Sequence, residues 1–536
     1  MNFDALYNPH PSQRMTTYGK NGMVATSQPL AAQAGLDIMK KGGNAVDAAI
    51  ATAACLTVVE PTSNGIGGDA FALVWMKDEL YGLNASGPSP KNISIDNLKE
   101  LGYKEIPPYG WMPVTVPGAP AAWVELSKRF GNLTLKETLA PAIAHAEEGY
   151  ALTPILGKFW QAGYMAFKQK LTDEMFENWF KTFAPKGRAP EIGEVWSSPD
   201  HANTLRAIAE TNGETFYHGD IAEKIDEFSR RYGGFLRKED LEEFQPEWVD
   251  PVSVNYRGYD VWEIPPNGQG LVALMALNIA KEFKFSGQHS VADYHKQMEA
   301  LKLAFVDGLE HITEYGSMKH SVDSLLSESY GKARSALIGE EAVSPAPGEP
   351  PKGGTVYLAA ADKEGNMVSF IQSNYMGFGS GLVVPGTGIA LQNRGHNFSF
   401  DPNHVNALEG GKRTYHTIIP GFLTKGGKAV GPFGVMGGFM QPQGHMQVVH
   451  NLVDYQLNPQ AALDAPRWQW VKEKQVIVEP TFPKDVAQAL ARKGHHIKVA
   501  LDSGSFGRGQ VIIRNQESGT LAGGTESRTD GAIAVW

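Results

Sequence analysis

The sequence predicts a mixed α+β protein, and three observations support this prediction. Residues 23–75 alternate small-residue helical stretches with glycine-rich joints and end in an apolar strand. Residues from about 120 to 335 have helical periodicity and are rich in aromatic and charged side chains. Residues 355–373 form two apolar runs around a short polar turn, the pattern of a β-hairpin.

The composition is that of an ordinary globular chain and excludes several classes of protein. Of the 536 residues, 42% are hydrophobic and 20% are charged, and 48 basic against 58 acidic side chains give a net charge of −10. An acidic chain is a poor candidate for a nucleic-acid or anionic-membrane surface. No apolar run reaches the roughly 18 residues of a membrane span, and the first residues do not form a secretory signal. We therefore expect a soluble, cytoplasmic protein.

The chain has one cysteine, Cys55, which excludes an internal disulfide and any site built from several thiolates. It lies in the run AIATAACLTVV, where a small core residue is expected. Just before this run, Gly42 and Gly43 are expected to end one helix and Asn44 to cap the next. The glycines of NGIGGDAF resemble a dinucleotide fingerprint but precede a strand and do not open a helix, so we reject that interpretation.

The segment Gly339–Gly354 interrupts regular structure. Its sequence, GEEAVSPAPGEPPKGG, is half proline and glycine, so neither a helix nor a strand can run through it. By composition alone it would be a flexible linker between two domains. The residues that follow favour a different role.

The hairpin after this arm places two hydroxyl groups opposite each other. Its turn is centred on Glu364, so cross-strand partners have numbers that sum to 728, and Thr355 is predicted to face Ser373. Thr355 is thus expected at the first position of a strand, directly after a Gly-Gly pair.

A threonine hydroxyl is a poor nucleophile until a base removes its proton. The sequence has neither a Gly-x-Ser-x-Gly elbow nor a His-Glu-x-x-His pair, and Ser329-x-x-Lys332 lacks its usual partner motifs. An N-terminal threonine can use its own α-amino group, whose pKa is about 7.7–8.0. That amine exists only if the chain is cut between Gly354 and Thr355, and the preceding glycine tolerates the strained backbone that such a cut needs.

Several stretches together resemble the γ-glutamyltransferase family of N-terminal nucleophile hydrolases over nearly the whole chain. They are GGNAVDAAIATAACLTVVEPTSNGIGGDAF, the Thr355 hairpin, GSGLVVPGTGIALQNRGHNFS, GKRTYHTIIP, GVMGGF and NLVDYQLNPQAALDAPRW. The resemblance implies a four-layer αββα sandwich with a helical region in its N-terminal part. It also implies a precursor cut into a large subunit, residues 1–354, and a small subunit, residues 355–536, which form one intertwined domain. It implies neither a metal nor an organic cofactor.

The resemblance also assigns roles to residues. Thr355 corresponds to the nucleophile and Ser373 to its supporting hydroxyl, while Gly437 and Gly438 correspond to the glycines whose amides form the oxyanion hole. That role suits glycine, because the donors must lie about 3 Å from the developing oxyanion; the alternative is a tight turn between strands.

Two further positions are read from the same resemblance. His416 and Thr417 stand where the family has two serines that line the pocket, although His416 could equally be a packed, hydrogen-bonded histidine. His445 and His450, which we expect to flank a helix, are read as structural.

Three positions depart from the family pattern and bear on specificity. Tyr375, Arg394 and Asn397 stand where γ-glutamyl enzymes commonly carry Asn, Gln and Asp. The segment NASGPSPKNIS also lacks the arginine that clamps the substrate α-carboxylate. The pocket is thereby more cationic and loses a partner for an ammonium group. This favours an acyl group that ends in a carboxylate without a free α-amine, either glutaryl, as in cephalosporin-type acylases, or an internal glutamyl of a polymer. A short segment between Ser399 and Arg413 predicts an open site.

The leading interpretation is a self-processed amidase or acyltransferase that acts on glutaryl or γ-glutamyl amides. One alternative is a glutathione hydrolase with true γ-glutamyl specificity. Another is an uncut, inactive relative that serves as a binding or scaffold protein. The sequence leaves open whether the protein forms a homodimer.

Overall fold

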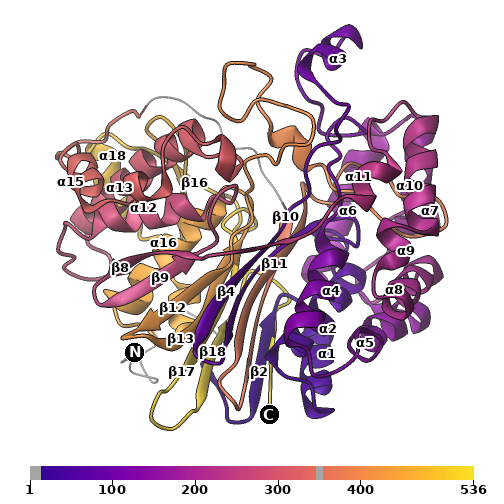
Figure 1. Cartoon of the computed structure of the whole chain (residues 1–536). Coiled ribbons are helices and arrows are strands. Elements are labelled where there is room, and N and C mark those ends of the chain that lie inside the picture. Colours follow the sequence, from indigo (N-terminus) through magenta and orange to yellow (C-terminus); the bar gives the residue numbers. More distant parts are fainter. Residues whose placement is uncertain (1–13, 346–353) are drawn as a thin grey trace.

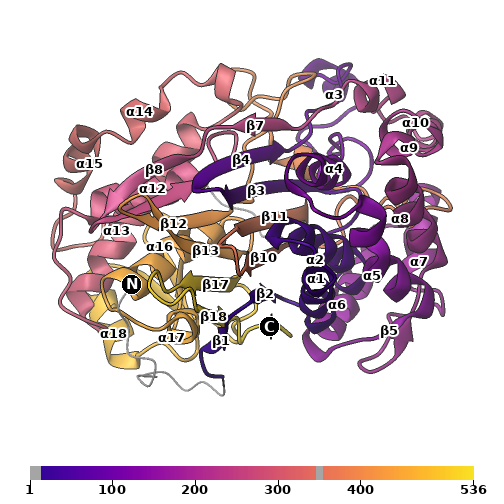
Figure 2. The same ribbon diagram turned by 60° about the horizontal axis from the view of Figure 1, so that its bottom comes forward.

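Two seven-stranded sheets, each antiparallel throughout, pack face to face, and helices cover both outer faces (Figure 1). The computed structural model describes residues 14–345 and 354–536. The view in Figure 2 separates the layers, with α1, α2 and α5 on one side of the sheet pair and α12, α13 and α16 on the other. The predicted four-layer αββα sandwich is confirmed.

Sheet A and sheet B each combine strands from distant parts of the chain. The order of sheet A is β1 (Thr17–Gly19), β18 (Leu521–Thr525), β17 (Arg508–Arg514), β13 (Lys428–Met436), β12 (Gly421–Lys425), β9 (Tyr259–Glu263) and β8 (Val252–Tyr256). The order of sheet B is β19 (Ala532–Val535), β2 (Gly22–Thr26), β10 (Gly354–Asp362), β11 (Met367–Tyr375), β3 (Asp69–Met76), β4 (Glu79–Ala85) and β7 (Glu247–Val249). Smaller sheets are formed by β14 (Trp468–Lys472), β15 (Gln475–Val478) and β16 (His496–Val499), and by β5 (Tyr150–Ala151) and β6 (Val195–Trp196).

The helices divide into one group beside sheet B and another beside sheet A. The helices of the first half of the chain are α1 (Pro29–Lys40), α2 (Ala45–Val59), α3 (Ile95–Glu100), α4 (Ala119–Phe130), α5 (Leu135–Glu148), α6 (Pro154–Lys170), α7 (Glu177–Phe183), α8 (Pro199–Thr211), α9 (Glu214–Tyr217), α10 (Asp220–Arg231) and α11 (Lys238–Glu242). The remaining ones are α12 (Gly270–Ala280), α13 (Val291–His311), α14 (Val322–Leu325), α15 (Glu328–Ser335), α16 (Met440–Val453), α17 (Pro459–Asp464) and α18 (Lys484–Arg492).

Helix α2 shows how the sequence builds the core beside sheet B. Every residue from Ala45 to Val59 is buried, because small side chains let neighbouring helices and the sheet approach on all sides. Gly42 has a positive φ of 105° after the end of α1, and the Asn44 side chain accepts hydrogen bonds from the amides of Val46 and Asp47. The predicted helix end, cap and buried Cys55 are therefore confirmed.

A third apolar cluster fills the space between the two sheets. It includes Phe71 from β3, Tyr357 from β10 and Ile371 from β11 on one side, and Phe422 from β12 and Ile512 from β17 on the other. These side chains are buried because alternate residues of each strand face the opposite sheet. This packing places β10 and β11 inside sheet B and against sheet A.

The positions of two histidines differ from the sequence prediction. His445 and His450 do not flank a helix but lie inside α16, where each contacts a carboxylate, Glu263 and Asp454 respectively, at 2.6 Å. Of the Pro/Gly-rich arm 339–354, residues 346–353 fall outside the described part of the chain, so the linker prediction is not assessed there. Among the described residues, no helix has both the length and the apolar character that a membrane crossing requires.

Candidate active site

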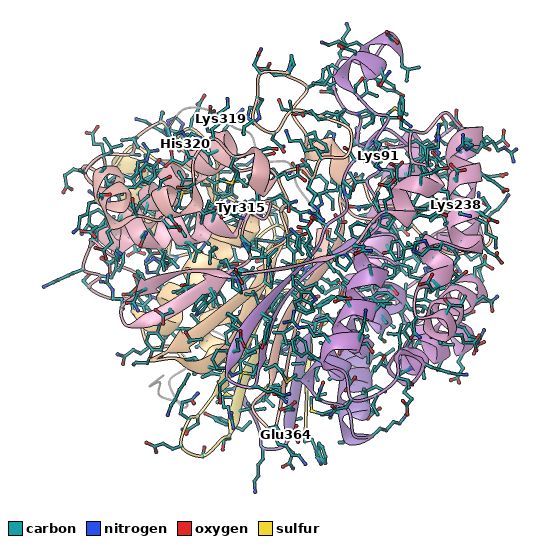
Figure 3. The ribbon with its side chains drawn as sticks, in the orientation of Figure 1. Lys91, Lys238, Tyr315, Lys319, His320 and Glu364 are labelled. Carbon is teal, nitrogen blue, oxygen red and sulfur yellow. The ribbon has the colours of Figure 1, made fainter. Side chains whose placement is uncertain are left out.

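The β10–β11 hairpin brings Thr355 and Ser373 together in the middle of sheet B. Val356 pairs with Gln372 and Tyr357 with Ile371, so partner numbers sum to 728, and the predicted register is confirmed. The Thr355 and Ser373 hydroxyl oxygens lie 3.1 Å apart. Glu364, in the turn, lies at the edge of the molecule in Figure 3, so the hydroxyl pair occupies the opposite, interior end of the hairpin.

A β-bulge lies at this hydroxyl pair. Gly354 pairs with Tyr375 and Val356 with Gln372, so Thr355 faces two residues, Ser373 and Asn374, on β11. Bulges of this kind re-aim side chains beside functional sites. Tyr375 has a positive φ of 75°, which is uncommon for a bulky residue, and its amide donates to the Ser373 hydroxyl at 2.8 Å. The backbone at the strand end is thus shaped to hold the Ser373 oxygen against Thr355.

Gly437 and Gly438 connect β13 to α16 next to this pair. Their φ values are +135° and +58°, and a Cβ on Gly437 would lie 3.1 Å from the Gly507 Cα, so a side chain at Gly437 would be crowded as well as strained. Within residues 14–345 and 354–536, neither glycine amide donates a hydrogen bond to another residue. The Gln441 side chain, in the first turn of α16, lies 3.5 Å from the Thr355 hydroxyl, which places the positive end of this helix beside Thr355.

Arg394 forms the centre of a second group of buried side chains. Its Nη1 donates to the Thr417 hydroxyl at 2.6 Å, its Nε lies 3.5 Å from Asp69 Oδ2, and its guanidinium stacks 4.4 Å from the Tyr375 ring. The Tyr375 hydroxyl in turn donates to Asn397 at 3.0 Å. Arg394 Nε and Nη2 have no hydrogen-bond partner among the described residues. We call Arg394, Asp69, Tyr375, Asn397, His416 and Thr417 the arginine cluster.

Asp69 is the residue of this cluster that sequence reasoning missed. It pairs with Ser373 across β3 and β11, is fully buried, and accepts hydrogen bonds from His416 at 2.7 Å and Gln392 at 2.7 Å. Its carboxylate offsets the positive charge of Arg394. The cluster is therefore less cationic than we predicted from the three positions that differ from the family pattern. The signal that could have identified it is an acidic residue at the start of an otherwise apolar strand, DAFALVWM.

The charges in the cluster follow from burial. Burial, reinforced by nearby Arg394, lowers the pKa of His416 to about 4, so the imidazole is neutral at neutral pH. It donates from Nε2 to Asp69, and its Nδ1 accepts from the Ile418 amide at 3.3 Å, the geometry of the packed histidine. Burial lowers the pKa of Arg394 to about 10 against the opposing effect of Asp69, so the guanidinium stays charged. A substrate-binding role for His416 stays a prediction.

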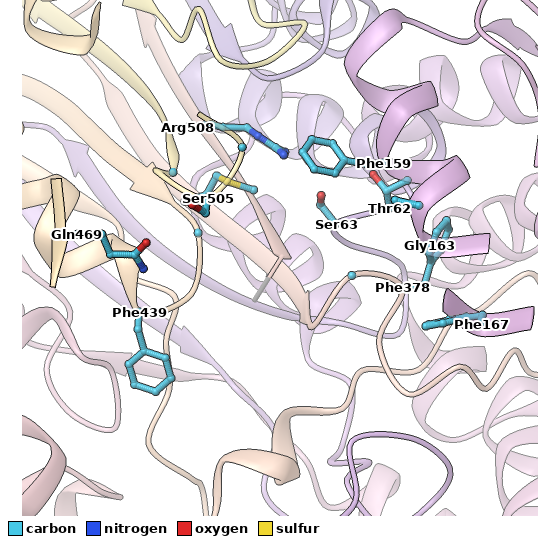
Figure 4. Close-up of a pocket in the computed structure, with 16 residues that line it drawn as sticks. Thr62, Ser63, Phe159, Gly163, Phe167, Phe378, Phe439, Gln469, Ser505 and Arg508 are labelled. Carbon is cyan, nitrogen blue, oxygen red and sulfur yellow. The ribbon is translucent and has the colours of Figure 1, made fainter. Parts of the chain in front are cut away.

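Access to Thr355 bears on the expectation of an open site. Thr355 is 1% exposed and the Ser373 and Arg394 side chains are fully buried. A cavity of about 360 Å³ (Figure 4) has Gly437 in its wall but neither Thr355 nor Ser373. These values describe the uncut chain, and the open site that the short segment 399–413 predicts for a cut enzyme stays a prediction.

One cluster of the described residues has the donor set of a metal site. His295, Glu299 and His495 are buried, with ligand atoms within 4.8 Å of one another. The Lys302 ammonium already lies 2.5 Å from Glu299, where a cation would sit, and the cluster contacts Gly339 and Val343. Neither Thr355 nor Ser373 belongs to this cluster.

The chain is similar in sequence to several known proteins. The family model for γ-glutamyltranspeptidase matches residues 31–536. The chain belongs to the γ-glutamyltranspeptidase family. It is 37% identical over 532 residues to the glutathione hydrolase-like YwrD proenzyme of Bacillus subtilis, covering 96% of this chain and 98% of that protein. It is 31% identical to the oxamate amidohydrolase proenzyme of Klebsiella pneumoniae, with 96% and 98% covered.

The fold of this γ-glutamyltranspeptidase-family protein is likewise shared with solved structures. A cephalosporin acylase from Bacillus halodurans is 65% identical, with a TM-score of 0.96 over 100% of this chain and 99% of that one. Relatives that are hydrolases and acylases identify this family member as a hydrolase or transferase enzyme.

The buried histidines predict how the stability of the protein depends on pH. Burial lowers the pKa of His201 and His416 to about 4 and, together with Lys302 and other cations, that of His495 to about 3, whereas burial raises that of Glu60 to about 7. Between pH 4.5 and 6.5 the unfolded chain binds more protons than the folded protein at the three histidines, and fewer than the folded protein at Glu60. Stability therefore falls as pH falls, by at most about 2.7 kcal/mol per pH unit from these groups.

Urea unfolding at pH 5.0, 5.75 and 6.5 measures this dependence. His201→Gln should reduce the slope by up to about 1.4 kcal/mol per pH unit, because it removes one titrating group. An unchanged slope in the variant contradicts the assignment of a neutral His201.

Proposed function

We propose that the chain is cut between Gly354 and Thr355 and that the new Thr355 amino terminus is the nucleophile of an amidase or acyltransferase. The observation that carries this proposal is the Thr355 hydroxyl, 3.1 Å from the Ser373 hydroxyl and beside two glycine amides without acceptors among the described residues. The names of the relatives support it, because those from Bacillus subtilis and Klebsiella pneumoniae are called proenzymes.

In this mechanism the Thr355 α-amino group accepts the hydroxyl proton while Oγ1 attacks the amide carbon. The carbonyl oxygen becomes an oxyanion that accepts hydrogen bonds from the Gly437 and Gly438 amides, and the α16 N-terminus adds favourable potential. The carbon–nitrogen bond then breaks, and the departing amine takes the proton from the α-ammonium. Water, or a second amine, attacks the acyl-threonine ester and regenerates the hydroxyl. Ser373 holds Oγ1 in position throughout.

We further propose that the arginine cluster receives an acyl group that ends in a carboxylate, with glutaryl as the preferred example. Arg394 Nη2 is buried without a hydrogen-bond partner among the described residues, a costly state that a substrate carboxylate would relieve. Asn397 in place of an acidic residue offers no anionic partner for an α-ammonium group. The cephalosporin acylase likeness supports this substrate class.

One observation favours true γ-glutamyl specificity as the second candidate. Asp69 brings a buried carboxylate to within 3.5 Å of Arg394, so the cluster is not free of negative charge. Its two oxygens already accept from His416 and Gln392. An ammonium group would have to compete with these donors, which is why we place glutaryl first.

Glutaryl- and γ-glutamyl-p-nitroanilide separate the two candidates. The wild-type enzyme is expected to hydrolyse the glutaryl compound at least as well as the γ-glutamyl compound. Arg394→Gln should lower kcat/KM for glutaryl by about 10- to 150-fold, the value of a charge-assisted contact. Asn397→Asp should shift the preference toward γ-glutamyl, because it restores an anion near the α-amine.

A wild-type enzyme that strongly favours γ-glutamyl, with no selective loss in Arg394→Gln, contradicts the glutaryl assignment. Cleavage of neither compound by a processed enzyme contradicts the substrate class as a whole.

A further inference from the structure

A cavity of about 360 Å³ has Gly437, the first residue of the glycine pair, in its wall. Met436, Gly437 and Phe439 line it, and Figure 4 shows Phe439 across from Phe159, Gly163 and Phe167 of α6. None of the arginine-cluster residues lines it. Its volume is within the range of about 300–1,000 Å³ that is typical of small-molecule sites.

Arg508 is the one charged side chain among the residues that line this cavity. It is the first residue of β17 and pairs with Met436, directly before Gly437, so the strand register places it at the glycine pair. Gly507 and Gly437 are closely packed, because a Cβ on Gly437 would lie 3.1 Å from the Gly507 Cα. The Arg508 backbone is therefore held beside Met436, one residue before Gly437.

The Arg508 guanidinium is buried but incompletely paired. The residue is 7% exposed, and its guanidinium carbon lies 4.2 Å from the centre of the Phe159 ring. Glu60 is its nearest carboxylate, 3.6 Å away, and the guanidinium donates no hydrogen bond to any residue within 14–345 or 354–536. Glu60 also accepts from the Ser27 hydroxyl, so Arg508 shares this carboxylate, and the charges of Glu526 and Asp530 further favour the ionised guanidinium without bonding to it.

The chemistry of the cavity fits an anion attached to an apolar body. Phe159, Phe167, Phe378 and Phe439 supply ring surface, and a guanidinium with vacant donors binds a carboxylate in a forked geometry. A substrate whose carbonyl lies at the glycine pair extends to both sides. If the arginine cluster takes the acyl half, this cavity, which includes Gly437, is available to the amine half.

We propose that this cavity binds the departing amine and that Arg508 selects amines bearing a carboxylate on an apolar or aromatic body, such as aromatic α-amino acids. The assignment of this cavity to the amine, and of the arginine cluster to the acyl group, rests on the proposed function. The natural substrates are then N-acyl amino acids or peptides with a free carboxylate close to the scissile amide.

A matched substrate pair tests this proposal. Glutaryl-L-phenylalanine and glutaryl-L-phenylalaninamide share the acyl group and the ring and differ in the carboxylate alone. The wild-type enzyme is expected to favour the carboxylate compound by about 10- to 150-fold in kcat/KM. Arg508→Gln should remove most of this preference. Arg508→Lys should keep part of the preference, because lysine retains the positive charge but cannot form two parallel hydrogen bonds to a carboxylate. Melting temperatures report whether each variant folds.

Arg514→Gln is the control, because Arg514 ends the same strand but lies in a different cavity with Gly365. It should keep the wild-type preference. A wild-type enzyme indifferent to the carboxylate, or an Arg508→Gln variant that keeps the preference, overturns the proposal.

A binding experiment separates this proposal from the proposed reaction. If neither glutaryl compound is hydrolysed, the acyl assignment fails, and calorimetry on Thr355→Ala still decides the role of Arg508. L-Phenylalanine should bind more tightly than L-phenylalaninamide, and adding Arg508→Gln should abolish the difference. Equal binding of the two compounds by Thr355→Ala overturns the proposal.

Discussion

Thr355→Ala is expected to leave a single chain of 536 residues, whereas the wild-type protein yields residues 1–354 and 355–536. The variant removes the hydroxyl that would attack the Gly354 carbonyl, and it removes the catalytic nucleophile. Turnover of any amide substrate should fall by at least about 10⁴-fold, as when other hydrolases lose their nucleophile. Denaturing gels measure the cleavage, and N-terminal sequencing of the small fragment should begin Thr-Val-Tyr-Leu-Ala.

Thr355→Ser is the matched control, because it keeps a hydroxyl at the same position and should still be cut. The alanine variant should fold, because Thr355 lies at the end of a strand whose remaining partners are unchanged. If Thr355→Ala is cut at the same bond, self-cleavage by Thr355 is wrong. If the wild-type protein is neither cut nor active, the result favours the alternative of an inactive binding or scaffold protein.

Ser373→Ala is expected to slow turnover by about 10- to 10⁴-fold, the range for groups that position a proton or a hydroxyl. The serine oxygen lies 3.1 Å from Thr355 Oγ1 and accepts from the Tyr375 amide, so its loss frees the nucleophile to rotate and leaves a buried amide unpaired. Steady-state kinetics measure the loss, with kcat affected more than KM.

Ser369→Ala is the control for this prediction. Ser369 lies on the same strand, is equally buried, and bonds the Tyr357 hydroxyl of β10 at 2.8 Å. Its replacement should lower stability while turnover changes far less than in Ser373→Ala. A covalent acyl adduct found on Ser373 by mass spectrometry would show that Ser373, and not Thr355, is the nucleophile.

Local rules were sufficient for much of the fold and for the centre of the site. A five-residue turn between two apolar runs determines the pairing of Thr355 with Ser373, because antiparallel register follows from the position of the turn. The cap at Asn44 was likewise identifiable, because its short side chain accepts hydrogen bonds from the first amides of the helix. Gly437 and Gly438 were identifiable because their positive φ values favour glycine. The placement of His445 and His450 inside α16 was missed, because helix boundaries depend on packing as well as pattern.

By itself the sequence determined the α+β class, the hydroxyl pair and the family resemblance, because these depend on short-range periodicity and on residues close together in the chain. Only the tertiary structure placed Asp69 against Arg394 and His416, since their strands and loops come from segments more than 300 residues apart. It also decided that Arg508 faces an aromatic cavity beside Gly437, because β17 and β13 become neighbours only when sheet A forms. Charge compensation and access to the site depend on such contacts, and sequence spacing carries no information about them.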